Sequence, residues 1–141
     1  MLGITALFAA LYLGFAFAIA PIPTLETGRC VNGLHEGSGV STAATRSVDC
    51  AKPHDNEVVG SVRYLGDGAD PGRAALVSFA QTQCGEAFGT YVGVDFQSSS
   101  LEMFIAMPSD LTWAKGDRQI GCVVLAGDDT MLTGSDKGTA R

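Results

Sequence analysis

Hydrophobic residues are concentrated at the start of the chain, where residues 2–20 carry no charged side chain. One helix of this length can cross the hydrocarbon core of a bilayer, which is ~30 Å thick. Pro21 and Pro23 follow the segment and would end such a helix. The pattern predicts a transmembrane signal-anchor helix over residues 1–22, a short linker over residues 23–27 and one domain over residues 28–141.

A cleaved signal peptide is the alternative for the same segment. Ala18-Ile19-Ala20 fits the small-x-small pattern of a cleavage site. However, no Lys or Arg precedes it, and Pro21 would follow the cut, where its fixed backbone disfavours protease binding. We therefore expect the helix to be retained in the membrane.

Small residues recur every four positions in this segment, at Ala6, Ala10, Gly14 and Ala18. Small residues let two helices approach closely, and close packing drives helix association within lipid. Such a register can also arise by chance, because Ala and Gly are common in membrane helices. The stripe favours a partner helix, and we expect integral membrane protein subunits as partners.

The rest of the chain contains several short strand-like stretches and one long stretch of helical periodicity. Strands are predicted at residues 28–31, 45–49, 57–65, 101–107 and 119–126. A helix is predicted over residues 70–92, with Asp70 as its cap and Pro71 at its first position. Its predicted buried stripe consists of Ala74, Val77, Ala80, Cys84, Ala87, Phe88 and Tyr91. Together they predict an α+β fold, with an antiparallel sheet of four or five strands packed on one long helix.

Two strand patterns also predict which side chains share a face of the sheet. In the first, one face would carry Val58, Gly60, Val62 and Tyr64, and the other Val59, Ser61, Arg63 and Leu65. In the second, Leu101, Met103, Ile105 and Met107 would alternate with Glu102, Phe104 and Ala106. Residues 113–117 are expected to form the turn before the last strand.

The formal net charge of −6 lies entirely in the predicted domain, and its Lys and Arg residues are scattered singly. Binding to nucleic acid, or to anionic lipid heads through a basic surface, requires clustered cations. The composition argues against both, and we expect no nucleic-acid partner.

Four cysteines, Cys30, Cys50, Cys84 and Cys122, are spread along the domain without a CxxC pair. Their spacing excludes the usual zinc-ribbon and thioredoxin patterns. An even number behind a membrane anchor indicates two disulfides in an oxidising compartment, with the N-terminus cytoplasmic and the domain extracytoplasmic. Four buried thiols in a cytoplasmic domain are the alternative. Three pairings are open from the sequence, and we favour Cys30–Cys122 with Cys50–Cys84.

The segment over residues 50–60 mixes a thiol, an imidazole and carboxylates, so chemistry has to be considered. A zinc site needs three or four converging ligands, and the other histidine, His35, lies in a predicted loop. A Cys50–His54 nucleophile pair fails if the thiol is oxidised. We expect a structural role, in which His54 or Asp55 hydrogen-bonds exposed backbone as the strand begins. The sequence thus predicts no catalytic residue, no cofactor and no metal.

Trp113 has two interpretations that the sequence does not separate. It could anchor its turn against the core, or it could be an exposed contact residue. We regard His54 and Trp113 as candidate partner contacts.

Several segments together resemble the actinobacterial septum formation domain. They read GRCV at residues 28–31, CAKPHDNEVVG at residues 50–60, WAKGDRQIGC at residues 113–122 and LTGSDKG at residues 132–138, with Cys84 between them. The resemblance covers nearly all of residues 28–141. It implies a membrane-anchored or secreted protein with no established catalytic centre, and a role in cell division.

The short linker suggests a more specific function. It would hold the domain against the membrane face, as in the small accessory subunits of the actinobacterial respiratory bcc-aa3 supercomplex, which have one helix and one outside domain. The likeness is in architecture and not in motif. Our leading expectation is a non-catalytic accessory subunit that stabilises such a complex; the alternatives are a septum formation or cell-wall-associated binding protein and, more remotely, an enzyme or redox carrier.

Overall fold

The computed structural model describes residues 25–34, 45–66, 69–128 and 130–141. The predicted transmembrane helix and its stripe at Ala6, Ala10, Gly14 and Ala18 lie outside these residues. Within the described part, no helix combines the length and hydropathy that crossing a bilayer requires.

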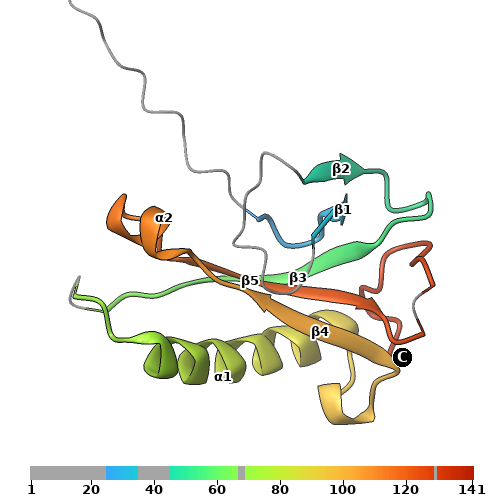
Figure 1. The fold of residues 1–141 in the computed structure, drawn as a ribbon. Coiled ribbons are helices and arrows are strands. Elements are labelled where there is room, and N and C mark those ends of the chain that lie inside the picture. Colours follow the sequence, from blue (N-terminus) through green and yellow to red (C-terminus); the bar gives the residue numbers. More distant parts are fainter. Residues whose placement is uncertain (1–24, 35–44, 67–68, 129) are drawn as a thin grey trace, which may run out of the picture.

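The domain is a five-stranded antiparallel sheet with one long helix packed on one face (Figure 1). The strands lie in the order β2-β1-β3-β5-β4, and every pair of neighbours is antiparallel. The strands are β1 (Cys30–Asn32), β2 (Arg46–Val48), β3 (Asn56–Arg63), β4 (Leu101–Ala106) and β5 (Gln119–Ala126). The helices are α1 (Arg73–Val92), the short 3-10 helix η1 (Phe96–Ser98) and α2 (Asp110–Ala114). The predicted α+β architecture is confirmed, although α2 occupies part of what was expected to be a turn.

The helix α1 begins three residues later than its predicted cap. Its N-cap is Gly72, at a φ of 82°, and no side chain caps it. The Asp70 carboxylate instead accepts a hydrogen bond from the Gly72 N–H at 2.8 Å, so it shapes the turn that leads into the helix. The helix ends as predicted at Val92, where Gly93 adopts the left-handed conformation and donates to the Gly89 carbonyl.

The buried stripe of α1 follows a spacing of four residues. It consists of Leu76, Ala80, Cys84, Phe88 and Val92. Ala80, Cys84 and Phe88 were predicted correctly, whereas Ala74 is exposed in the first turn and Leu76 takes its place in the core.

A β-bulge in β3 changes which of its side chains face the helix. The register with β5 shifts between Val58, which pairs with Val123, and Gly60, which pairs with Cys122. Val59 is the extra residue and joins the core under α1, whereas Val58 packs on the other face. The predicted face that combined Val58 with Gly60 is therefore wrong, because a bulge interrupts the period of two. The alternation predicted for β4 is confirmed.

The face of the sheet away from α1 carries a second hydrophobic cluster. Its buried members are Leu25, Val31, Leu34, Val58, Phe104, Ala106 and Val123. Leu25 fills the space left by Gly121, where an added Cβ would lie 2.5 Å from the leucine Cδ1. Residue 25 was predicted to belong to a linker, but it is part of the domain core.

The domain contains two disulfides, but they join different cysteines from the pairing that we favoured. The structure links Cys30 with Cys50 and Cys84 with Cys122, each with Cα atoms 5.3 Å apart. The strand order explains the correction. The strand of Cys30 is two strands away from that of Cys122, and two inter-strand spacings of about 4.8 Å exceed the Cα separation that a disulfide can span.

Candidate functional site

The most concentrated polar site in the described residues surrounds the carboxylate of Glu57. Glu57 lies near the start of β3, and its side chain is fully buried on the α1 side of the sheet. A carboxylate removed from water is destabilised unless donors surround it. Three donors do so: the Tyr91 hydroxyl at 2.6 Å, the Ser135 hydroxyl at 2.6 Å and the Asp136 backbone N–H at 2.7 Å.

These partners come from three separate elements of the fold. Glu57 is on β3, Tyr91 is in the last turn of α1, and Ser135 and Asp136 belong to the C-terminal segment. The network therefore fastens the C-terminal segment and the end of the helix to the same point of the sheet. Backbone bonds from Gly138 to the Tyr91 carbonyl and from Ala140 to the Val92 carbonyl extend this attachment.

The tyrosine of the network resists ionisation. Burial, and secondly the hydrogen bond to Glu57, raise the pKa of Tyr91 to about 12 from a usual value of 10.0. When a phenol that donates to an adjacent carboxylate ionises, the hydrogen bond is lost and the two negative charges repel each other. At neutral pH Tyr91 is therefore a fixed donor and is poorly suited to act as a base.

A second buried carboxylate lies beside the network. The Asp136 side chain is 1% exposed, and its Oδ1 accepts from the Arg141 Nε at 2.6 Å. Its Oδ2 has no hydrogen-bond partner among the described residues. The pair links the end of the described chain to the same corner of the domain.

A metal site at Glu57 is excluded by the state of its neighbours. The carboxylate lies within 4.8 Å of the sulfur atoms of Cys30 and Cys50, which by distance alone could form a three-ligand cluster. Both sulfurs are joined in a disulfide and are therefore not thiolates, which is the form that binds metal. Glu57 instead packs beside the disulfide that closes the loop between β1 and β3.

The segment around His54 forms hydrogen bonds to backbone groups of the kind expected from the sequence. His54 is fully buried, its Nδ1 lies 2.8 Å from the Lys52 carbonyl, and its backbone forms a two-way bridge with Leu132. The Asp55 carboxylate accepts from the Gly33 N–H at 3.2 Å. Since the His54 ring has no exposed surface, it is not available to a partner in this conformation.

Trp113 lies half-buried at the other end of the sheet. Its ring packs against Tyr64, with centroids 5.9 Å apart, and the Arg118 guanidinium stacks over it at 3.8 Å. Arg118 also donates to the Trp113 carbonyl at 2.7 Å. The ring thus anchors α2 to the end of the sheet, while its partial exposure leaves the contact interpretation as a prediction.

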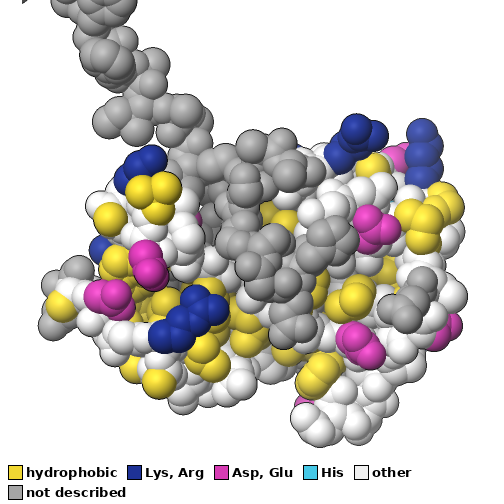
Figure 2. Space-filling view, viewed as in Figure 1, with side chains coloured by type: hydrophobic (Ala, Val, Ile, Leu, Met, Phe, Trp, Pro, Cys, Tyr) yellow, Lys and Arg dark blue, Asp and Glu magenta, His cyan; other side chains and the backbone are white. Residues whose placement is uncertain are grey.

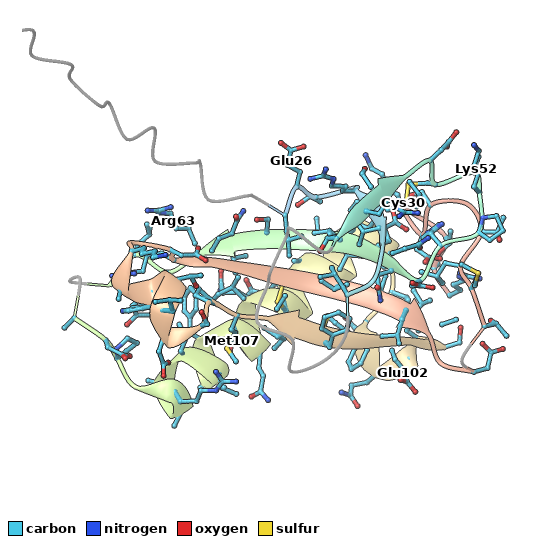
Figure 3. The ribbon with its side chains drawn as sticks, turned by 45° about the horizontal axis from the view of Figure 1, so that its top comes forward. Glu26, Cys30, Lys52, Arg63, Glu102 and Met107 are labelled. Atoms are coloured by element: carbon cyan, nitrogen blue, oxygen red, sulfur yellow. A yellow bond between two sulfur atoms is a disulfide. The ribbon has the colours of Figure 1, made fainter. Side chains whose placement is uncertain are left out.

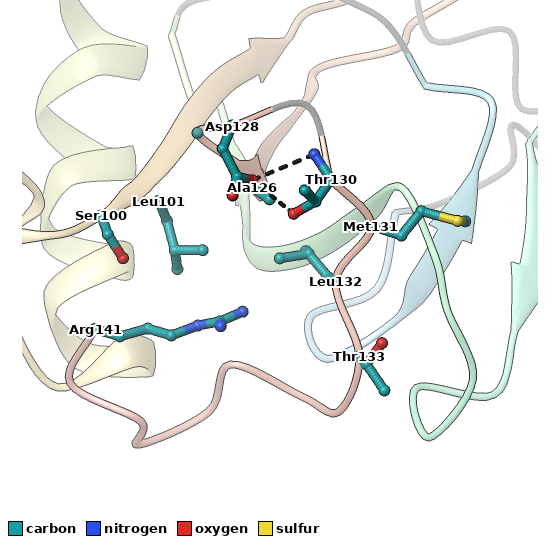
Figure 4. A pocket seen from close by; sticks show the side chains of 10 residues that line it. Ser100, Leu101, Ala126, Asp128, Thr130, Met131, Leu132, Thr133 and Arg141 are labelled. Carbon is teal, nitrogen blue, oxygen red and sulfur yellow. Dashed lines mark hydrogen bonds between the residues drawn. The ribbon is translucent and has the colours of Figure 1, made fainter.

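A polar hollow of about 430 Å³ lies beside the C-terminal segment (Figure 4). Asp128 lies on its wall, and its carboxylate accepts hydrogen bonds from the Thr130 hydroxyl and N–H, which lower the pKa of Asp128. The Arg141 side chain extends below Leu132 (Figure 4). The described residues that line the hollow include no histidine or cysteine, and the Thr130 hydroxyl donates to Asp128 within a local turn.

A comparison with known protein families matches residues 22–139 to the septum formation family. The chain belongs to this family. The resemblance noted from its motifs is thereby confirmed, and the match includes all but the last two described residues. No curated protein and no solved structure matches the chain.

The Glu57 network was missed by sequence reasoning. A glutamate at the start of a strand whose next residues are Val58 and Val59 was a sign that a charge enters the core. Its partners lie up to 79 positions away in the chain, and nothing in the sequence pattern connects them. Only the docking of the C-terminal segment on β3 brings them together.

Proposed function

We propose that this protein is a non-enzymatic binding module of the cell-division or cell-wall machinery, tethered to the outer face of the plasma membrane. Its membership of the septum formation family supports this assignment. The observation that carries the non-enzymatic part is the use of the reactive side chains. Glu57 and Asp136 are buried in the network, His54 is buried under backbone, and the described cysteines are all in disulfides.

The two disulfides favour the extracytoplasmic side. Disulfides persist in oxidising compartments and are rare in the cytosol. The uncharged segment over residues 2–20 would supply the tether, with its N-terminus in the cytoplasm. A direct check is mass spectrometry of protein alkylated in intact cells before lysis: no alkylated cysteine is expected, and four alkylated cysteines would contradict this location.

An accessory subunit of a respiratory bcc-aa3 supercomplex is the second candidate. The burial of Leu25 in the domain core favours it, because only residues 21–24 then separate the domain from the apolar segment. So short a tether restricts the domain to partners at the membrane face, where a high effective concentration strengthens weak contacts.

Affinity purification of the full-length tagged protein in mild detergent separates the two candidates. Septal or cell-wall proteins in stoichiometric yield would support the first, and respiratory subunits in stoichiometric yield would support the second and overturn the first. A Gly14→Leu variant tests whether the helix takes part, since it blocks close approach along the small-residue stripe. Phe15→Leu on another face is the matched control. Equal recovery of the partner with both variants would contradict helix packing.

A further inference from the structure

One end of the domain carries exposed leucines that the interior does not explain. Leu65, two residues after the end of β3, is 83% exposed and Leu111 in α2 is 66% exposed. Both lie at the same end of the sheet, because Tyr64 and Trp113, which are close to them in the chain, are in ring contact. Figure 2 shows hydrophobic, Lys or Arg, and Asp or Glu side chains close together in the region of α2.

We call this surface the α2 end and define it by five exposed residues: Arg63, Leu65, Asp110, Leu111 and Lys115. Exposed apolar side chains that lie together within a polar rim are typical of a protein or membrane contact, and aromatic rings are enriched at the lipid interface. The net charge of −6 argues against a contact driven by anionic lipid, so the leucines would supply the binding energy.

The chain enters the domain at the same end. The Leu25 carbonyl accepts from the Gln119 side chain at 3.4 Å, and Gln119 pairs with Arg63 in the sheet. In Figure 3 the labelled Glu26 and Arg63 both lie along the upper side of the domain. Any membrane segment that precedes Leu25 therefore leaves the domain beside the α2 end.

The length of the connecting chain limits how far this end can be from the bilayer. Residues 21–24 separate the uncharged segment from Leu25. Four extended residues reach roughly 14 Å at about 3.5 Å each. A domain of this size has a radius of gyration of about 13 Å. The domain therefore cannot turn its far side to the membrane while Leu25 stays packed in the core.

We propose that the α2 end rests on the outer lipid surface, with Leu65 and Leu111 inserted at the boundary between headgroups and acyl chains. Arg63 and Lys115 would extend to the phosphates around them. This inference rests on the membrane tether of the proposed function. It fixes the orientation of the domain. The polar hollow, which lies by Leu101 at the opposite end of β5, then faces away from the membrane.

The protein contains one tryptophan, Trp113, which serves as an internal probe. The full-length protein is reconstituted into phosphatidylcholine vesicles with or without lipids brominated near the headgroup end of the acyl chains. Bromine quenches a tryptophan only at close range, so contact of the α2 end with lipid is expected to quench Trp113. Flotation of the vesicles reports separately whether the protein is anchored.

The variant Leu65→Asp/Leu111→Asp removes the proposed contact. We expect the equilibrium constant for lipid contact to fall by at least on the order of tenfold, since the burial of a single leucine side chain contributes about a factor of that size. Met131→Asp replaces an exposed hydrophobic residue outside the α2 end and should leave quenching unchanged. Because all three side chains are exposed, thermal melting should show that the variants fold.

Each outcome bears on a different claim. Flotation with quenching that only the double leucine variant loses supports the proposal. Flotation without quenching of the wild-type protein overturns the lipid contact but leaves the tether intact, and would mean that this end is free or covered by protein. Quenching that survives the leucine substitutions also overturns it. Failure to float refutes the tether itself, and the lipid contact with it.

Discussion

The substitution Glu57→Gln tests whether the buried carboxylate stabilises the domain. Glu57 accepts from the hydroxyls of Tyr91 and Ser135 and from the backbone N–H of Asp136. Glutamine has nearly the same shape. Its oxygen can stay on the Asp136 N–H while its amide group faces the two hydroxyls, which can rotate to accept. The substitution therefore removes the charge without leaving a large cavity.

The magnitude follows from the three hydrogen bonds. A bond to a charged group contributes about 1.5–3 kcal/mol, against about 0.5–1.5 kcal/mol for a neutral pair. A loss of about 1 kcal/mol for each of three bonds predicts a decrease of ~3 kcal/mol in the free energy of unfolding. For a domain of this size, each kcal/mol shifts the melting temperature by about 4 °C, so Glu57→Gln should melt roughly 12 °C lower.

The assay is thermal and urea unfolding followed by circular dichroism, under non-reducing conditions. Glu86→Gln is the matched control, because Glu86 is exposed on α1 and should shift the free energy by less than about 0.5 kcal/mol. A Glu57→Gln protein as stable as the wild type would refute the reasoning. It would mean that the free-energy cost of burying the carboxylate equals the stabilisation from its three hydrogen bonds, as is known for some buried ion pairs.

Three further predictions concern the interior of the domain. Burial raises the pKa of Tyr91 to about 12, so the stability that this phenol contributes should be complete below pH 10 and lost as the pH rises toward 12. Tyr91→Phe should remove that loss of stability at alkaline pH, and an absorbance titration of the wild type should show one tyrosine ionising near pH 12. Gly60→Ala should cost about 1–3 kcal/mol because its Cβ would lie 2.5 Å from a helix side chain, whereas Gly85→Ala, which meets nothing within 4 Å, should gain about 0.5–1 kcal/mol in urea unfolding. Removing the disulfide with Cys84→Ala/Cys122→Ala should lower the free energy of unfolding by ~4 kcal/mol, given its sequence separation of 38. A non-reducing peptide map that found Cys122 joined to another cysteine would contradict the pairing.

Local pattern was sufficient where local physics decides the structure. The long helix ends at Val92 because Gly93 accepts a left-handed backbone, and a glycine directly after a helical pattern can be read from the chain. The strand β4 was recognisable because its side chains alternate between the two faces of the sheet, and this alternation survives in the structure. The strand β5 was recognisable as an apolar run, and the structure buries its central residues.

The positions that the sequence misassigned depend on neighbours distant in the chain. The bulge at Val59 is set by the pairing of β3 with β5, so a period of two along one strand does not reveal it. The burial of Leu25 depends on the space above Gly121, nearly a hundred positions later.

The sequence by itself determined the kind of domain: an oxidised α+β unit behind an uncharged segment, without the residue spacing of a metal or redox motif. Only the tertiary structure decided how its sulfurs and charges pair. Cys30 bonds Cys50 because β3 separates it from Cys122, and Glu57 is held because the C-terminal segment folds back onto β3. Spacing along a chain fixes which way a side chain points on its own element, whereas distance in space depends on which elements become neighbours.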